Sequence, residues 1–188
     1  MLFEISHGEM VASLGEDAVF VAPPGSLGDV PEDLSAARFL YSTGIPAGVF
    51  QPQRCTEAGR FPLVGDKVDL AHHENAPAGC ASWPVFGWLQ VAHLALDPAT
   101  GSVHGFCEDG GPVRSLHADL SSLAYLAFSL HRLLREFDWR DGEDEDFARL
   151  EEAVEGVRAA VEERDPLPFQ GDSLWLPVLD EMASGMWS

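Results

Sequence analysis

The chain has 188 residues, of which 46% are hydrophobic, so we expect one domain over residues 1–188 with an ordinary apolar core. Its 31 Asp+Glu outnumber its 11 Lys+Arg, and the formal net charge of −20 argues against nucleic-acid binding because phosphates repel such a surface. The N-terminal segment MLFEISHGEM lacks the basic start of a signal peptide, and no apolar run approaches the roughly 20 residues that span a membrane, so we expect a cytoplasmic location.

The first half of the chain predicts short strands and one short helix. A helix is expected to open at Pro31, which is followed by acidic residues, and to end before Gly44. Residues 85–96 are almost continuously apolar, which predicts a central strand buried on both faces. The other predicted strands are 18–21, 47–51, and a pair formed by 61–64 and 68–72 across a Gly-Asp-Lys turn.

The stretch HLALDPATGSVHGF, residues 93–106, predicts a hairpin around its DPATG turn. With a four-residue loop, His93 pairs with Phe106 and His104 pairs with Ala95. The two imidazoles then share one face, one diagonal step of roughly 7–8 Å apart. Zinc needs three or four ligands, so we favour an ordinary half-buried pair. A metal-dependent enzyme that uses His93 and His104 stays open as an alternative.

The second half of the chain changes to helical periodicity. After a strand at 113–116, apolar residues at three-four spacing predict helices beginning near Asp119, over 147–161, and over 173–182. Strands followed by helices indicate an α+β fold, with a mixed, mostly antiparallel β-sheet and helices packed on one side.

Acidic residues concentrate between the two long helices. Residues 138–165 hold 12 acids against four arginines. A solvated helix cap is the simplest interpretation, and a docking patch for a basic partner is the alternative. Tryptophans usually lie in the core, but Trp83 is in a loop rich in Pro and Gly, so exposure is the alternative that makes it a candidate contact. The acidic residues of this proposed partner-binding set are Asp141, Glu143, Asp144, Glu145 and Asp146.

Signatures of catalysis are absent from the sequence. There is no GxSxG elbow and no phosphate-binding GxxxxGK[ST] or GxGxxG loop. His72 and His73 are adjacent, so on a strand they point to opposite faces. The three cysteines show no CxxC spacing, which fits free thiols in a reducing compartment. We therefore predict no catalytic residue, no metal site and no cofactor.

Four stretches, taken in order, resemble the SUKH superfamily of bacterial immunity proteins, and in particular its fourth family. They span about residues 19–182. The chain differs from that pattern after Leu116, where relatives tend to carry Asn and Ser and this sequence has His117-Ala118-Asp119. The four stretches are RFLYSTGIPAGVF, LALDPATGSVHGF, VRSLHADLSSLAYLAFSLHRLL and DPLPFQGDSLWLPVLDEM.

The resemblance implies a SUKH-like α+β fold and a non-enzymatic, intracellular protein encoded beside a polymorphic toxin. Such a protein binds and neutralises its cognate toxin, often a nuclease or a nucleic-acid deaminase. The charge of −20 fits a basic toxin, blocked by steric and electrostatic occlusion. A general adaptor module of the same fold, with a partner that is not a toxin, is the other alternative.

Overall fold

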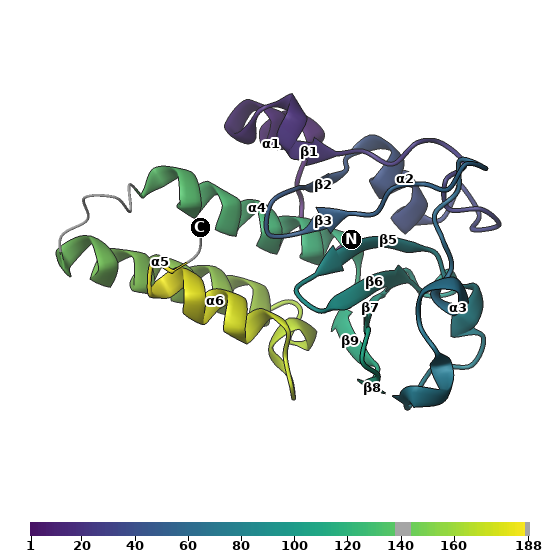
Figure 1. Cartoon of the computed structure of the whole chain (residues 1–188). Helices are drawn as coiled ribbons and strands as arrows, with labels where there is room; N and C mark the ends of the chain where they lie inside the picture. Colours follow the sequence, from purple (N-terminus) through teal and green to yellow (C-terminus); the bar gives the residue numbers. More distant parts are fainter. Residues whose placement is uncertain (138–143, 187–188) are drawn as a thin grey trace.

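The largest sheet of the computed structural model carries the predicted hairpin at its centre (Figure 1). The structure describes residues 1–137 and 144–186, and of residues 144–146 it describes the backbone alone. Within these ranges the sheet has five strands in the order β3-β5-β6-β7-β9, and each neighbouring pair is antiparallel. The strands are β3 (Gln51–Pro52), β5 (Val85–Leu89), β6 (Ala92–Leu96), β7 (Val103–Cys107) and β9 (Arg114–His117).

The register of the β6–β7 hairpin is the predicted one. His93 lies opposite Phe106, and His104 lies opposite Ala95. The Asp97 carboxylate organises the turn, because it accepts hydrogen bonds of 2.8 Å from the Ala99 amide and from the Thr100 hydroxyl. Gly101 ends the turn at φ +80°, a conformation that glycine adopts without a steric penalty.

The long helices pack on one side of this sheet. Alternate residues of β6, namely Ala92, Leu94 and Leu96, are fully buried in one core cluster with leucines of α4. Helix α4 (Leu120–Glu136) begins where predicted, because the Asp119 carboxylate caps it by accepting from the Ser122 amide at 3.0 Å. The other helices on this side are α1 (His7–Leu14), α2 (Ser35–Ser42), α5 (Asp144–Glu162) and α6 (Trp175–Ala183).

The opposite face of the sheet is covered by the segment 61–84. This segment contains the one-turn helix α3 (Val64–Lys67) and the 3₁₀ turns Leu70–His72 and Cys80–Ser82. It encloses a second, smaller core together with Val85, Ala95 and Phe106 of the sheet. The three cysteines are free thiols, as predicted.

Two small strand pairs flank the main sheet. Strands β1 (Val19–Phe20) and β2 (Ile45–Pro46) pair antiparallel near α1. Strands β4 (His73–Glu74) and β8 (Gly111–Pro112) pair parallel, so the strand pairing is mixed and mostly antiparallel, as predicted. No α-helix in the described ranges combines the length and the apolar composition that a membrane crossing requires.

Two predicted strands are wrong because their chain segments turn. Residues 85–96 form β5 and β6 around a tight turn in which Gln90 has φ +52° and Val91 is 59% exposed. Residues 47–50 bend around the His131 imidazole, whose Nδ1 contacts the Ala47 carbonyl oxygen at 2.9 Å. The strand predicted over 47–51 is therefore reduced to β3, which begins at Gln51.

The predicted strand pair at 61–64 and 68–72 is also wrong. The Asp66 carboxylate accepts a hydrogen bond of 3.1 Å from the Leu63 amide, which favours a helical turn, and residues 64–67 form α3. The helix predicted from Pro31 begins later, at Ser35 in α2, because residues 31–34 form a turn instead.

Candidate partner-binding surfaces

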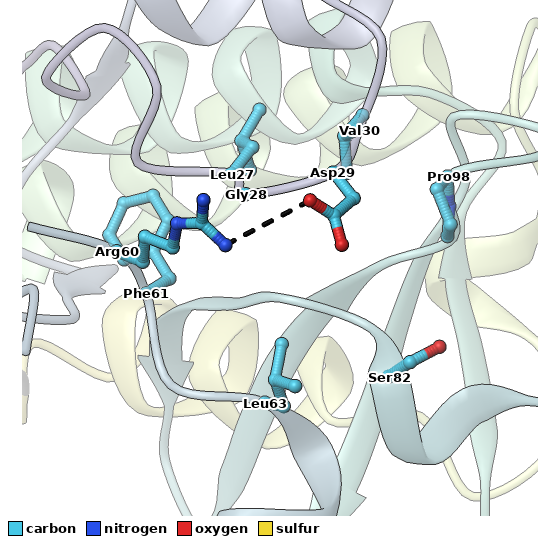
Figure 2. A pocket seen from close by; sticks show the side chains of 9 residues that line it. All are labelled: Leu27, Gly28, Asp29, Val30, Arg60, Phe61, Leu63, Ser82 and Pro98. Atoms are coloured by element: carbon cyan, nitrogen blue, oxygen red, sulfur yellow. Dashed lines mark ion pairs between the residues drawn. The ribbon is translucent and has the colours of Figure 1, made fainter. Parts of the chain in front are cut away.

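A hollow opens between the segments 27–30 and 60–63, beside Ser82 and Pro98 (Figure 2). The Phe61 amide donates a hydrogen bond of 2.7 Å to the Ser26 carbonyl oxygen and holds the two segments together. Figure 2 shows Arg60 reaching toward Asp29, with 3.8 Å between Nη1 and Oδ1. Both side chains are strongly exposed, so this ion pair contributes little to stability.

The lining and size of this hollow suit a side chain of a partner protein. Leu27, Val30 and Phe61 are buried around it, and Leu63 is 39% exposed. The volume is about 270 Å³, just below the range of roughly 300–1,000 Å³ that small-molecule sites occupy. A hollow of this size can accommodate one side chain of a partner protein.

The two hairpin histidines share a face but have different partners. The ring of His93 stacks edge-on against Trp88, with 4.4 Å between centroids, and its Nε2 lies 3.9 Å from Glu108 Oε1. His104 Nε2 is hydrogen-bonded to the Ser102 hydroxyl at 2.9 Å. Across residues 1–137 and 144–186, no three His, Cys, Asp or Glu side chains converge as metal ligands would. The geometry gives no support to the alternative of a metal-dependent enzyme at this pair.

Burial lowers the pKa of both histidines. For His93 the Lys67 ammonium lowers the pKa further, and the Glu108 carboxylate opposes the shift. For His104 burial is the main cause, and the Asp97 carboxylate opposes it by raising the pKa. Both rings are therefore neutral at pH 7.

The alternative that Trp83 is exposed is wrong, because its indole lies in the second core. Its side chain is 6% exposed, and its ring centroid lies 4.9 Å from that of His104 and 6.3 Å from that of Phe106. The 3₁₀ turn at Cys80–Ser82 directs Trp83 inward, and the Trp83 carbonyl oxygen accepts from the Val64 amide at 3.0 Å. Little of the indole is left for a partner to contact.

The predicted acidic patch lies almost wholly beyond what the structure describes. Asp141 and Glu143 fall outside the described residues, while Asp144, Glu145 and Asp146 begin α5 with side chains that are not described. The acidic character continues along the described part of α5 in exposed side chains. These are Glu151, Glu152, Glu155 and Glu162, and the exposed Glu163 follows the helix directly.

A buried polar network around His117 is the feature that the sequence analysis missed. Trp175 Nε1 donates to His117 Nε2 at 2.9 Å, and His117 Nδ1 lies 2.9 Å from the Ser122 hydroxyl and 3.7 Å from Asp165 Oδ2. The His117 and Ser122 side chains are fully buried, and Asp165 is 1% exposed. The network joins β9, α4 and α6 through side chains that are far apart in the sequence.

The indole N–H fixes the protonation of this network, because it is a donor and never an acceptor. His117 Nε2 must accept, so the imidazole is neutral and carries its proton on Nδ1, facing Ser122. Burial lowers the pKa of His117 and outweighs the neighbouring Asp165 and Asp119 carboxylates. Burial acts to raise the pKa of Asp165, but the neighbouring His117 and Ser122 side chains and the Ala118 amide, which donates to the carboxylate at 2.9 Å, lower the pKa overall.

Ser122, His117 and Asp165 are the residue types of a hydrolytic triad, but their arrangement is closed to substrate. The Ser122 hydroxyl is fully buried, and both nitrogens of His117 already have partners. A general base must reach both the nucleophile and a bound substrate. The network therefore stabilises the packing of the fold.

The chain matches the model of a known protein family. The SUKH-4 immunity protein family matches residues 5–181, nearly the whole chain. No curated protein and no solved structure matches the chain significantly. The match implies immunity to a cognate toxin, in a family whose members are generally not enzymes. The chain belongs to the SUKH-4 immunity protein family.

Proposed function

We propose that this protein binds its cognate toxin in the cytoplasm and blocks it by steric and electrostatic occlusion of a basic cleft. The toxin would be a nuclease or a nucleic-acid deaminase, because such enzymes hold phosphates with basic surfaces. The observation that carries the proposal is the net charge of −20 on a member of an immunity protein family. The negative charge of this protein repels nucleic acid and anionic membranes. The same charge attracts a basic toxin and speeds its association with this protein.

Occlusion requires no chemistry from the immunity protein, so the proposal needs no cofactor. Carboxylates that cover the cleft compete directly with the phosphates of the substrate for the same cations. The acidic set Asp141, Glu143, Asp144, Glu145 and Asp146 remains a proposed docking patch on the basis of its charge.

We also propose that residues 1–188 act as one domain. Contacts between distant parts of the chain support this proposal. The Phe3 amide donates to the Ser121 hydroxyl at 3.0 Å, and Trp175 is bound to His117. Both ends of the described chain thus pack against its centre.

Co-expression with the toxin encoded by the adjacent gene tests the proposal. We expect the tagged immunity protein to co-purify with the toxin and to protect cells that express it. We expect neutralisation of the acidic set by Asp→Asn and Glu→Gln changes to slow association and to flatten its salt dependence. Failure both to bind and to protect would contradict the toxin assignment. A complex with another protein, without protection, would favour the adaptor alternative.

A further inference from the structure

Helices α5 and α6 lie side by side (Figure 1). Residues of both helices line a groove on the surface of the protein. The groove has a volume of about 300 Å³, and its lining combines four apolar residues, here called the floor, with four charged ones. Val154 and Leu179 are almost fully buried beneath it, at 3% and 4% exposure. Leu176 and Ala183 are half-buried and leave apolar surface along the α6 side.

Carboxylates stand on both rims of this groove. Glu151 and Glu155 line the α5 side, Asp180 lines the α6 side, and all three are exposed. Arg158 is the cation in the lining, and it lies 3.5 Å from Glu155 and 3.9 Å from Glu162. Among the described residues, neither Glu151 nor Asp180 has a cation within 4.0 Å. Glu151 on one rim and Asp180 on the other therefore present negative charge that no cation in the described part of the chain neutralises, above the apolar floor.

A groove with an apolar floor and acidic rims favours one kind of binding partner. A groove between two helices receives a third helix, whose apolar side chains at i and i+3 or i+4 enter the floor. The rims require that helix to carry Lys or Arg on both flanks of its apolar stripe. A second copy of this chain is disfavoured, since each copy carries a charge of −20.

We propose that the α5–α6 groove binds a basic amphipathic helix of the toxin. The identity of the partner rests on the proposed function, whereas the chemistry of the occupant rests on the groove itself. Apolar contacts with Leu176 and Ala183 anchor the helix, and the carboxylates of Glu151, Glu155 and Asp180 pair with its cations.

Two triple variants of the full chain with equal net charge test the groove against the toxin from the adjacent gene. The groove variant carries Glu151→Gln, Glu155→Gln and Asp180→Asn. The control neutralises exposed acids on other elements and carries Glu16→Gln, Glu57→Gln and Asp109→Asn. We expect the groove variant to bind the toxin at least about tenfold more weakly, and the control to lose less than about twofold. Equal losses, or no loss, would overturn the proposal.

A synthetic helix separates this inference from the toxin assignment. The probe is a fluorescent 18-residue Leu/Lys amphipathic peptide, and its control is a scrambled peptide of the same composition. We expect fluorescence anisotropy to show binding of the amphipathic peptide about tenfold tighter than that of the scramble. The groove variant should remove this preference. Equal binding of both peptides would overturn the groove proposal, even if the toxin binds elsewhere on the protein. A preference for the amphipathic peptide without any binding of the toxin would support the groove and contradict the toxin assignment.

Discussion

Trp175 donates its indole N–H to Nε2 of His117 across 58 residues of sequence, and neither side chain is exposed to solvent. The bond joins the first turn of α6 to the last residue of β9. Because the site is closed to solvent, no water molecule can replace the indole as the partner of His117 Nε2. The stability of the C-terminal helix on the sheet therefore depends on this pair.

Replacing Trp175 by Phe removes the donor and part of the ring volume. We expect the free energy of unfolding to fall by about 2–4 kcal/mol, because the buried His117 nitrogen loses its partner and a cavity opens. Urea denaturation followed by circular dichroism measures the change. The matched control is Trp88→Phe, since Trp88 is only half-buried and should cost less. Equal losses in the two variants would contradict the special role of the His117 pair.

Acid should destabilise the protein below pH 6.5. The pKa of His117 is lowered by burial from its usual 6.5, so below that pH the unfolded chain binds a proton that the folded chain does not. The free energy of unfolding then decreases as the pH falls toward the folded-state pKa. The lowered pKa of Asp165 adds a second loss as the pH falls below 3.8, where the unfolded carboxyl protonates first.

The variant His117→Gln tests the first of these pH windows. Urea denaturation at several pH values between 6.5 and 4 should show a smaller dependence of stability on pH than in the wild type. Some dependence should remain, because burial also lowers the pKa of His93, His104 and His131. The exposed His72 provides the control variant, His72→Gln. A slope unchanged by His117→Gln would show that another group controls the acid response.

Two glycine-to-alanine changes should have opposite effects on stability. A Cβ at Gly87 would lie 1.8 Å from Cε2 of the fully buried Phe50, so we expect overpacking to destabilise the protein by about 1–3 kcal/mol. Gly156 is exposed within α5 with nothing within 4 Å of its Cβ position, and Ala there should stabilise the helix by about 0.5–1 kcal/mol. Thermal denaturation of both variants provides the comparison, and a stable Gly87→Ala protein would contradict the close packing of β5 on Phe50.

Zinc should not stabilise the protein through the hairpin histidines. A metal that binds the folded state raises the unfolding midpoint, but His93 and His104 are engaged with Trp88 and Ser102 respectively. We expect the same midpoint with and without added zinc in the wild type and in a His93→Ala/His104→Ala variant. A zinc-dependent rise that the double variant abolishes would restore the metal-site hypothesis.

The sequence predicts those elements whose local signals agree with their tertiary surroundings. The β6–β7 register follows from the Asp97 turn and from two-residue alternation, and the start of α4 follows from the Asp119 cap. The turn at Gln90 was missed because β5 and β6 are both buried, which makes the whole run from Val85 to Leu96 apolar. An apolar run gives no indication of where the chain reverses direction.

The binding surfaces and the polar network were harder to predict, because tertiary packing assembles them. His117, Ser122, Asp165 and Trp175 come from three parts of the chain, and local spacing does not connect them. One signal was present, namely the departure from the resembling sequences at His117. The composition of its loop kept exposure of Trp83 as an alternative, whereas its indole packs within the second core.

The bond between His117 and Trp175 also has a consequence for synthesis. A ribosome adds about 5–20 residues per second, so the 58 residues that separate this pair delay Trp175 behind His117 by roughly 3–12 s. During that interval the nascent sheet and α4 hold a histidine whose acceptor nitrogen has no partner. Helix α6 can dock on the sheet only after Trp175 has been made, so the histidine at the end of β9 gains its indole partner later than it gains its neighbours in the sheet and in α4.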